Sequence, residues 1–96
     1  MKIAVWDTYV PRKMRSGESE PTIMHFDILV PTDTGFDRVQ QFGRIFLAEK
    51  GESDQPISAT ECRFCHVESA SQAVVNEIQR RGFSIIEMQG CEPRGI

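Results

Sequence analysis

The chain has 96 residues, of which 40% are hydrophobic and 26% are charged, a composition typical of one globular domain rather than a disordered segment. A domain this short buries roughly 60–65% of its unfolded surface, which leaves room for one modest core. The 11 basic and 14 acidic residues give a net charge of −3, and this balance argues against a nucleic-acid partner, which usually selects a basic patch.

The N-terminus and the cysteine count predict a cytosolic protein without a membrane anchor. Asp7 interrupts the apolar residues near the start, whereas a signal peptide needs about 7–15 apolar residues in a row. No segment approaches the roughly 18 apolar residues of a membrane helix. The three cysteines are an odd number, and a reducing cytosol disfavours structural disulfides, so we expect reduced thiols or metal ligands at Cys62, Cys65 and Cys91.

Two segments near the N-terminus predict a pair of strands. Residues 2–10 and 22–30 are rich in apolar, β-branched and aromatic side chains. Pro11 ends the first segment, and Pro21 and Pro31 border the second. The polar stretch between them is long for a hairpin loop.

The remaining elements follow as two helices and two further strands. Apolar residues spaced three and four apart predict a helix over 34–50, and a second helix over 69–82 ends at a glycine. A strand is expected near 61–67, because the two helices need sheet between them to cover, and a final strand over 83–88.

This order, β-β-α-β-α-β, predicts a single α+β domain over residues 1–91 followed by a disordered tail at 92–96. We expect a mixed sheet with both helices packed on one face. The predicted core consists of apolar residues on the helices and the strands: Trp6, Phe26, Ile28, Val39, Phe42, Phe46, Val74, Ile78 and Ile86.

The run Glu61-Cys62-Arg63-Phe64-Cys65-His66 is the most distinctive in the chain and has four interpretations. It matches a haem-attachment motif, but it lacks an export signal. It has the spacing of a redox pair, but the next capped helix begins too far away to lower a thiol pKa. It could bind zinc through Cys62, Cys65 and His66, with Cys91 as a fourth ligand. The sequence favours the fourth interpretation, an ordinary strand with buried cysteines.

A second candidate site lies on the predicted hairpin. If Val10 pairs with Thr22, Asp7 lies opposite His25 and shares a face of the sheet with Asp27. A carboxylate beside an imidazole is typical of general acid–base catalysis, although no nucleophile can be placed beside them. The sequence favours a simple cross-strand charge pair at Asp7, His25 and Asp27.

Several of these runs together resemble a known family. They are Val5-Trp6-Asp7-Thr8-Tyr9-Val10, Met24-His25-Phe26-Asp27, the cysteine run and Met88-Gln89-Gly90-Cys91. They are similar to short bacterial proteins of the domain-of-unknown-function family numbered twenty twenty-four. The resemblance spans about residues 1–91 and implies a small cytosolic α+β domain. It implies no substrate, reaction or catalytic residue.

Three functions follow from the sequence, in order of preference. The first is a non-catalytic binding module that presents Tyr9, Ile23, His25 and Leu29 on an uncovered sheet face to a protein partner or to a second copy of the chain. The second is a zinc protein that uses the cysteine and histidine set. The third is an acid–base enzyme built on the hairpin carboxylates and imidazole.

Overall fold

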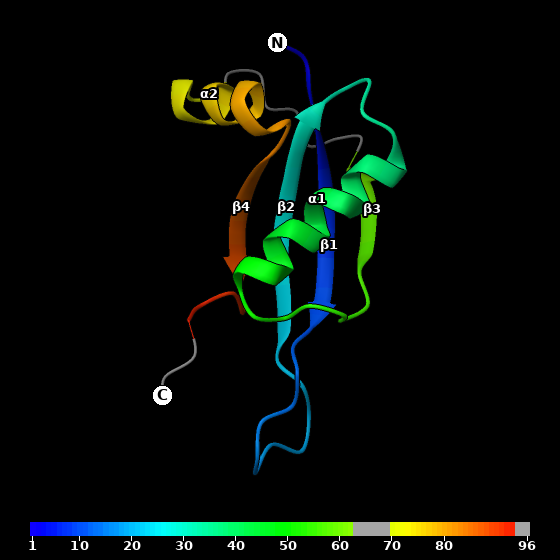
Figure 1. Ribbon diagram of the computed structural model, residues 1–96, viewed down its shortest axis with the longest axis vertical. Coiled ribbons are helices and arrows are strands. Elements are labelled where there is room, and N and C mark those ends of the chain that lie inside the picture. The colour runs from blue at the N-terminus through cyan, green and yellow to red at the C-terminus, as the bar shows by residue number, and fades with distance from the viewer. Residues whose placement is uncertain (63–69, 94–96) are drawn as a thin grey trace.

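The predicted order of elements is confirmed by the structure, a computed structural model that describes residues 1–62 and 70–93 (Figure 1). Within these residues a four-stranded sheet and two helices form one small α+β domain. The elements are β1 (Ile3–Pro11), β2 (Ile23–Pro31), α1 (Phe36–Glu49), β3 (Ser58–Cys62), α2 (Gln72–Arg81) and β4 (Ser84–Gln89).

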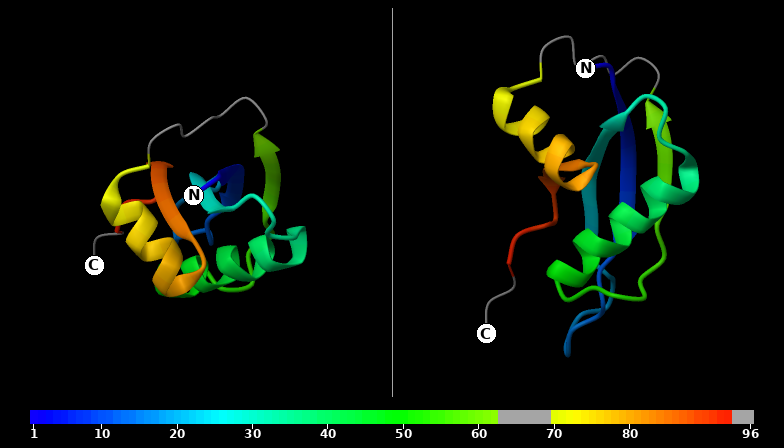
Figure 2. Two further views of the ribbon diagram at one scale, coloured as in Figure 1. Left: turned by 90° about the horizontal axis from the view of Figure 1, so that it is seen from above. Right: turned by 45° about the horizontal axis from the view of Figure 1, so that its top comes forward.

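The sheet has the strand order β3-β1-β2-β4, and each neighbouring pair is antiparallel. The expectation of a mixed sheet is therefore wrong. β2 and β3 do run in the same direction, but β1 lies between them, so the connection through α1 passes over one strand and brings no parallel pair together. Figure 2 shows β3 and β4 at the two edges of the sheet.

The hairpin of β1 and β2 has a register that differs from the predicted one. Each strand begins and ends one residue later than expected, and Pro11 pairs with Ile23. Asp7 therefore lies opposite Asp27, and Tyr9 rather than Asp7 lies opposite His25. The register differs by two residues in total, so every side chain keeps its predicted face of the sheet.

One sheet face forms the main core against α1. Val39, Phe42, Phe46 and Leu47 of the helix are buried in the same cluster as Phe26 and neighbouring apolar residues of β1 and β2. The ring centroids of Phe26 and Phe46 are 4.6 Å apart, a distance typical of a favourable aromatic pair. Stripes of large apolar residues on α1 and on alternate strand positions thus account for the packing of this layer.

The second helix packs on the opposite face, which corrects the expectation that both helices share one face. Ser71 caps α2 by accepting a hydrogen bond from the Val74 amide, and Gly82 ends it with φ 90°. Its buried residue Ile78 packs against Val5 and Leu29, whose side chains point away from α1. As a result α2 covers only the end of this face near Ile3 and Leu29.

Three further expectations are corrected. β3 lies at Ser58–Cys62 rather than near 61–67, and the rest of the predicted strand falls at positions outside the described residues. Ile86, predicted in the core, is exposed because it pairs with Asp27 on the face away from α1. Leu29, predicted on an open surface, is buried beneath Ile78.

The two ends of the described chain add two observations. The carbonyl of Glu92, the first residue of the predicted tail, accepts a hydrogen bond of 2.8 Å from Arg12. Among the described residues, neither helix combines the length and the apolar character needed to cross a membrane.

Candidate functional site

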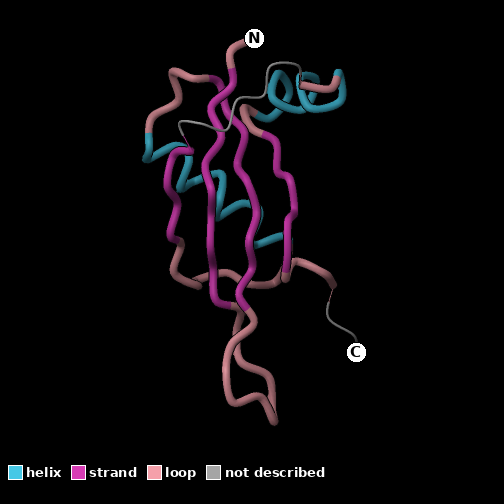
Figure 3. The backbone as a smooth tube through the Cα atoms, turned by 180° about the vertical axis from the view of Figure 1, so that it is seen from behind, coloured by secondary structure: helices cyan, strands magenta, loops and turns pink. Residues whose placement is uncertain are grey.

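The sheet face opposite α1 carries polar residues in its centre. Seen from behind in Figure 3, the sheet has α1 on its far side, and α2 lies near the N-terminal end of β1. The register places Thr60, Asp7, Asp27 and Ile86 in one row across the four strands. The next row away from α2 contains Ser58, Tyr9, His25 and Gln89. This part of the sheet, which we call the open face, therefore brings the predicted hairpin carboxylates and imidazole together.

Asp7, His25 and Asp27 form a compact cluster on the open face. Nε2 of His25 is 3.6 Å from Oδ1 of Asp7. One donor atom from each of the three residues can be chosen so that all of them lie within 4.8 Å of one another. Asp7 and His25 are not hydrogen-bonded at this distance, but both contact the same small volume as Asp27.

The pKa of Asp27 is raised from 3.8 to about 6 by its surroundings. The largest cause is burial, which disfavours the charged carboxylate. A hydrogen bond with the Asp7 side chain and repulsion from the Asp7 charge raise the pKa further, and the nearby charge of His25 lowers it. Two carboxylates directly opposite each other on adjacent strands repel, so this pair reduces the stability of the sheet when both are ionised.

Two buried atoms of the cluster have no hydrogen-bond partner among the described protein groups. They are Nε2 of His25 and Oδ1 of Asp27. A buried polar atom without a partner costs about 1–3 kcal/mol, so the protein retains these groups against a stability penalty. Tyr9 stacks on the His25 ring with a centroid distance of 4.4 Å and an interplanar angle of 8°, which fixes the plane of the imidazole. The cluster is therefore oriented by packing and is not neutralised by it.

The comparisons with known proteins identify the family of this chain. The model of the family described as Domain of unknown function (DUF2024) matches residues 1–88. The chain belongs to this family. An NMR structure of protein NE1680 from Nitrosomonas europaea is 29% identical in sequence to this DUF2024 chain, with a TM-score of 0.69, and the alignment covers 96% of this chain and 100% of that chain. No match was found among curated proteins.

The predicted zinc ligands of this DUF2024 domain are not gathered by its described residues. Cys62 ends β3 at one edge of the sheet, whereas Cys91 follows β4 at the other edge. Three strand spacings of about 4.8 Å separate the edges by about 14 Å, far more than the ~4 Å between ligands of one zinc ion. Cys91 is therefore not a co-ligand of Cys62, which corrects the four-residue set. Cys65 and His66 lie outside the described residues.

The thiol of Cys91 has a structural environment instead. Its side chain is 3% exposed, and its sulfur lies 3.5 Å from the carbonyl oxygen of His25 and 3.4 Å from that of Gln89. Burial raises the pKa of this thiol, and the charge of Glu87 adds to the effect. Since a metal ligand or nucleophile must be a thiolate, this environment disfavours either role for Cys91.

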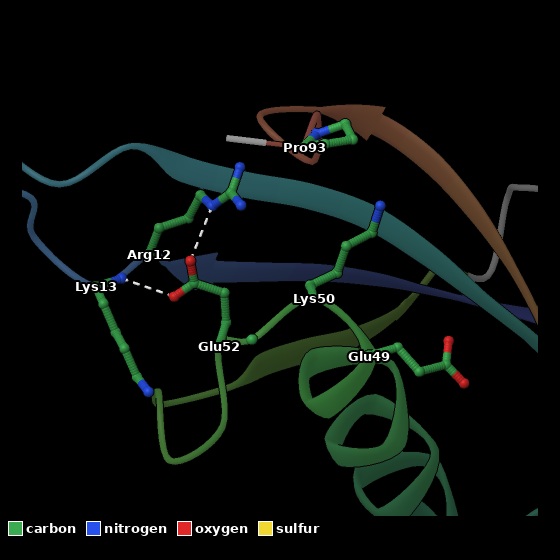
Figure 4. Close-up of a pocket in the computed structure, with 7 residues that line it drawn as sticks. Arg12, Lys13, Glu49, Lys50, Glu52 and Pro93 are labelled. Atoms are coloured by element: carbon green, nitrogen blue, oxygen red, sulfur yellow. Dashed lines mark hydrogen bonds and ion pairs between the residues drawn. The ribbon is translucent and has the colours of Figure 1, made fainter. Parts of the chain in front are cut away.

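A hollow of about 510 Å³ lies near the start of the hairpin loop of the DUF2024 domain (Figure 4). Its charged side chains already have partners within the protein. Arg12 pairs with Glu52 at 3.1 Å and donates to the carbonyls of Gly90 and Glu92. Lys50 pairs with Glu87, and the remaining acidic side chain of the lining, that of Glu49, pairs with Arg81. We interpret this region as a structural clasp and the open face as the candidate site.

Sequence reasoning found the three central residues of the site but missed two of their neighbours. Tyr9 was predicted on the same surface, but its stacking on His25 depends on the observed register. Thr60 was missed because β3 begins before the predicted strand and has no alternating apolar pattern. A hydroxyl directly across from Asp7 could have been found only by placing β3 correctly.

Proposed function

We propose that this protein is a non-catalytic binding domain whose partner contacts the open face. The single observation that carries the proposal is the position of the Asp7–His25–Asp27 cluster, which lies in the centre of a sheet face that α1 leaves uncovered. Polar groups that are oriented but not neutralised within the protein provide specific contacts for a ligand.

The surroundings of the cluster support contact with a partner surface. Tyr9, Ile23, Ile86 and Met88 are exposed large apolar side chains on or beside the open face. A polar centre with aromatic and aliphatic side chains around it offers both orientation and apolar contact area. The hollow described above and a smaller one of about 300 Å³ near Gly82 are lined by other residues, so the cluster is presented on a surface rather than inside these hollows.

The proposal is tested by two matched substitutions. Ile23 on the open face is 48% exposed, and Ile45 on the outer surface of α1 is 44% exposed. The wild-type protein and the Ile23→Glu and Ile45→Glu variants are immobilised, and bound proteins and small molecules from the source cells are identified by mass spectrometry. We expect a ligand that is retained by the wild type and by Ile45→Glu and lost with Ile23→Glu.

Two results would count against the proposal. One is a ligand lost equally with both variants, which would place the contact elsewhere or indicate misfolding; circular dichroism spectra of both variants separate these causes. The other is the absence of any specific ligand together with a strictly monomeric wild-type protein in size-exclusion chromatography, since a second copy of the chain is one partner that the open face could bind.

A further inference from the structure

We propose that Asp7, His25 and Asp27 bind one divalent transition-metal ion. This inference rests on the proposed function, because it names the chemistry at the centre of the open face. It differs from the zinc site predicted from the sequence, because it uses none of the cysteines.

The distances within the cluster are close to those of a metal site. Donor atoms that bind zinc at about 2.0–2.2 Å in tetrahedral geometry lie about 3.3–3.5 Å from one another. His25 Nε2 and Asp7 Oδ1 are already 3.6 Å apart, and the largest separation in the set of three is within 4.8 Å. The ligands therefore need to close by about 1.5 Å at most, which side-chain rotation provides without backbone movement.

The backbone that carries the ligands is held on both sides. Asp7 lies on β1 and the other two ligands lie on β2, and these are the two central strands of the sheet. β3 and β4 pair with their outer edges, so neither ligand strand is free to move away from the other. Ligands on rigid elements form a more precise site than ligands on loops.

The charges of the cluster also match a divalent cation. Two ionised carboxylates and a neutral imidazole carry a charge of about −2, so one divalent ion removes the repulsion between Asp7 and Asp27. The two unpaired buried atoms, His25 Nε2 and Asp27 Oδ1, are lone-pair donors suited to a metal. A cation at this position therefore satisfies the groups that the protein itself leaves unsatisfied.

The donor set indicates which metals are preferred. Imidazole nitrogen favours ions such as Zn²⁺, Fe²⁺ and Co²⁺ over Mg²⁺ and Ca²⁺, and carboxylate oxygens disfavour Cu⁺. Three protein ligands leave one tetrahedral position for water or for a group of the bound partner. Tyr9, stacked on His25, is a positioning residue that holds the imidazole plane.

The experiment titrates chelator-treated, reduced protein with Zn²⁺ by calorimetry and with Co²⁺ by visible absorption. We expect one ion per chain and a four- or five-coordinate Co²⁺ spectrum without thiolate charge transfer. Asp7→Asn, Asp27→Asn and His25→Gln should each weaken Zn²⁺ binding by tenfold or more. Asp33→Asn, an exposed aspartate outside the cluster, is the matched control and should bind like the wild type.

Each other outcome overturns the inference. Binding that survives Asp27→Asn and shows thiolate-to-cobalt charge transfer would place the ion on the cysteines. Zn²⁺ affinity weaker than millimolar would exclude a site of this kind. Neither result changes the comparison of Ile23→Glu with Ile45→Glu, so failure of the metal site is distinguishable from failure of the proposed binding face. Tyr9→Ala should weaken Zn²⁺ binding severalfold, while the Co²⁺ spectrum keeps its form.

Discussion

At the scale of single residues, the opposed carboxylates of Asp7 and Asp27 make stability depend on pH. The pKa of Asp27 is raised from 3.8 to about 6, so between these values the folded protein binds this proton more tightly than the unfolded chain does. The free energy of unfolding contributed by Asp27 therefore falls as the pH rises through this range. Above about pH 6 the penalty is fully present.

The Asp27→Asn variant tests this linkage in metal-free protein. We expect it to be more stable than the wild type at pH 7 and to lose this advantage as the pH falls toward 4. A shift of one pKa unit corresponds to 1.36 kcal/mol, and solvent screening at this half-buried position reduces the expected gain to about 1 kcal/mol.

The measurement is urea unfolding of both proteins from pH 4 to pH 8, analysed as the difference between them so that other carboxylates cancel. Asp33→Asn serves as the control and should give a difference that does not vary with pH. A destabilised Asp27→Asn variant at pH 7 would show that the Asp7–Asp27 pair is not repulsive in the folded protein.

The residues of this cluster could be predicted from the sequence, although their register could not. Alternation along a strand fixes the face on which a side chain lies, and a shift of two residues leaves that face unchanged. Asp7, His25 and Asp27 were therefore assigned to one face from the sequence, and the structure places them there. The partner across the hairpin depends on where the long loop closes, which the bordering prolines left uncertain by one residue in each strand.

At the scale of elements, the turn after β4 depends on a glycine. Gly90 has φ 73°, and a Cβ atom added there would lie 2.2 Å from the carbonyl oxygen of Ile23. Gly51 has φ 72°, but a Cβ atom there would meet nothing within 4 Å. The two positions therefore share a backbone conformation and differ in the available space.

This difference predicts unequal costs for the same substitution. Gly51→Ala should cost about 1–2 kcal/mol of unfolding free energy, the cost of a left-handed conformation for a residue with a Cβ atom. Gly90→Ala should cost more, because the backbone of β2 must also shift where His25 begins the candidate site. Thermal or urea unfolding of the two variants checks this, and equal costs would contradict the close approach of Gly90 to Ile23.

The elements that sequence reasoning misplaced share a physical cause. β3 is an edge strand whose residues are exposed or half-buried, so it lacks the alternating apolar signal that located β1 and β2. α2 was identified from its capping and periodicity, but these features do not say which sheet face its apolar side meets. Local signals therefore predicted where α2 occurs, and tertiary packing decided where it lies.

At the scale of the whole molecule, the Arg12–Glu52 clasp joins three distant parts of the chain. Arg12 follows β1, Glu52 follows α1, and both side chains are about 5% exposed or less. Arg12 also donates to Gly90 and Glu92 beyond β4, and Glu52 accepts a 2.8 Å hydrogen bond from the Lys13 amide. The sequence placed Arg12 in a polar loop and gave no sign of this clasp, because its partners are 39 to 80 residues away.

Breaking the clasp on one side should destabilise the fold more than replacing both partners. Arg12→Met leaves the Glu52 carboxylate buried without its cation, which costs about 3–5 kcal/mol for a buried pair. The Arg12→Met/Glu52→Met double variant removes the uncompensated charge, but the carbonyls of Gly90 and Glu92 still lose their donor. We therefore expect the double variant to recover only part of the loss, in a double-mutant cycle by urea unfolding. Full recovery would show that the contacts of Arg12 with Gly90 and Glu92 contribute nothing to stability, and a loss below about 1 kcal/mol in Arg12→Met would show that the pair is solvated in solution.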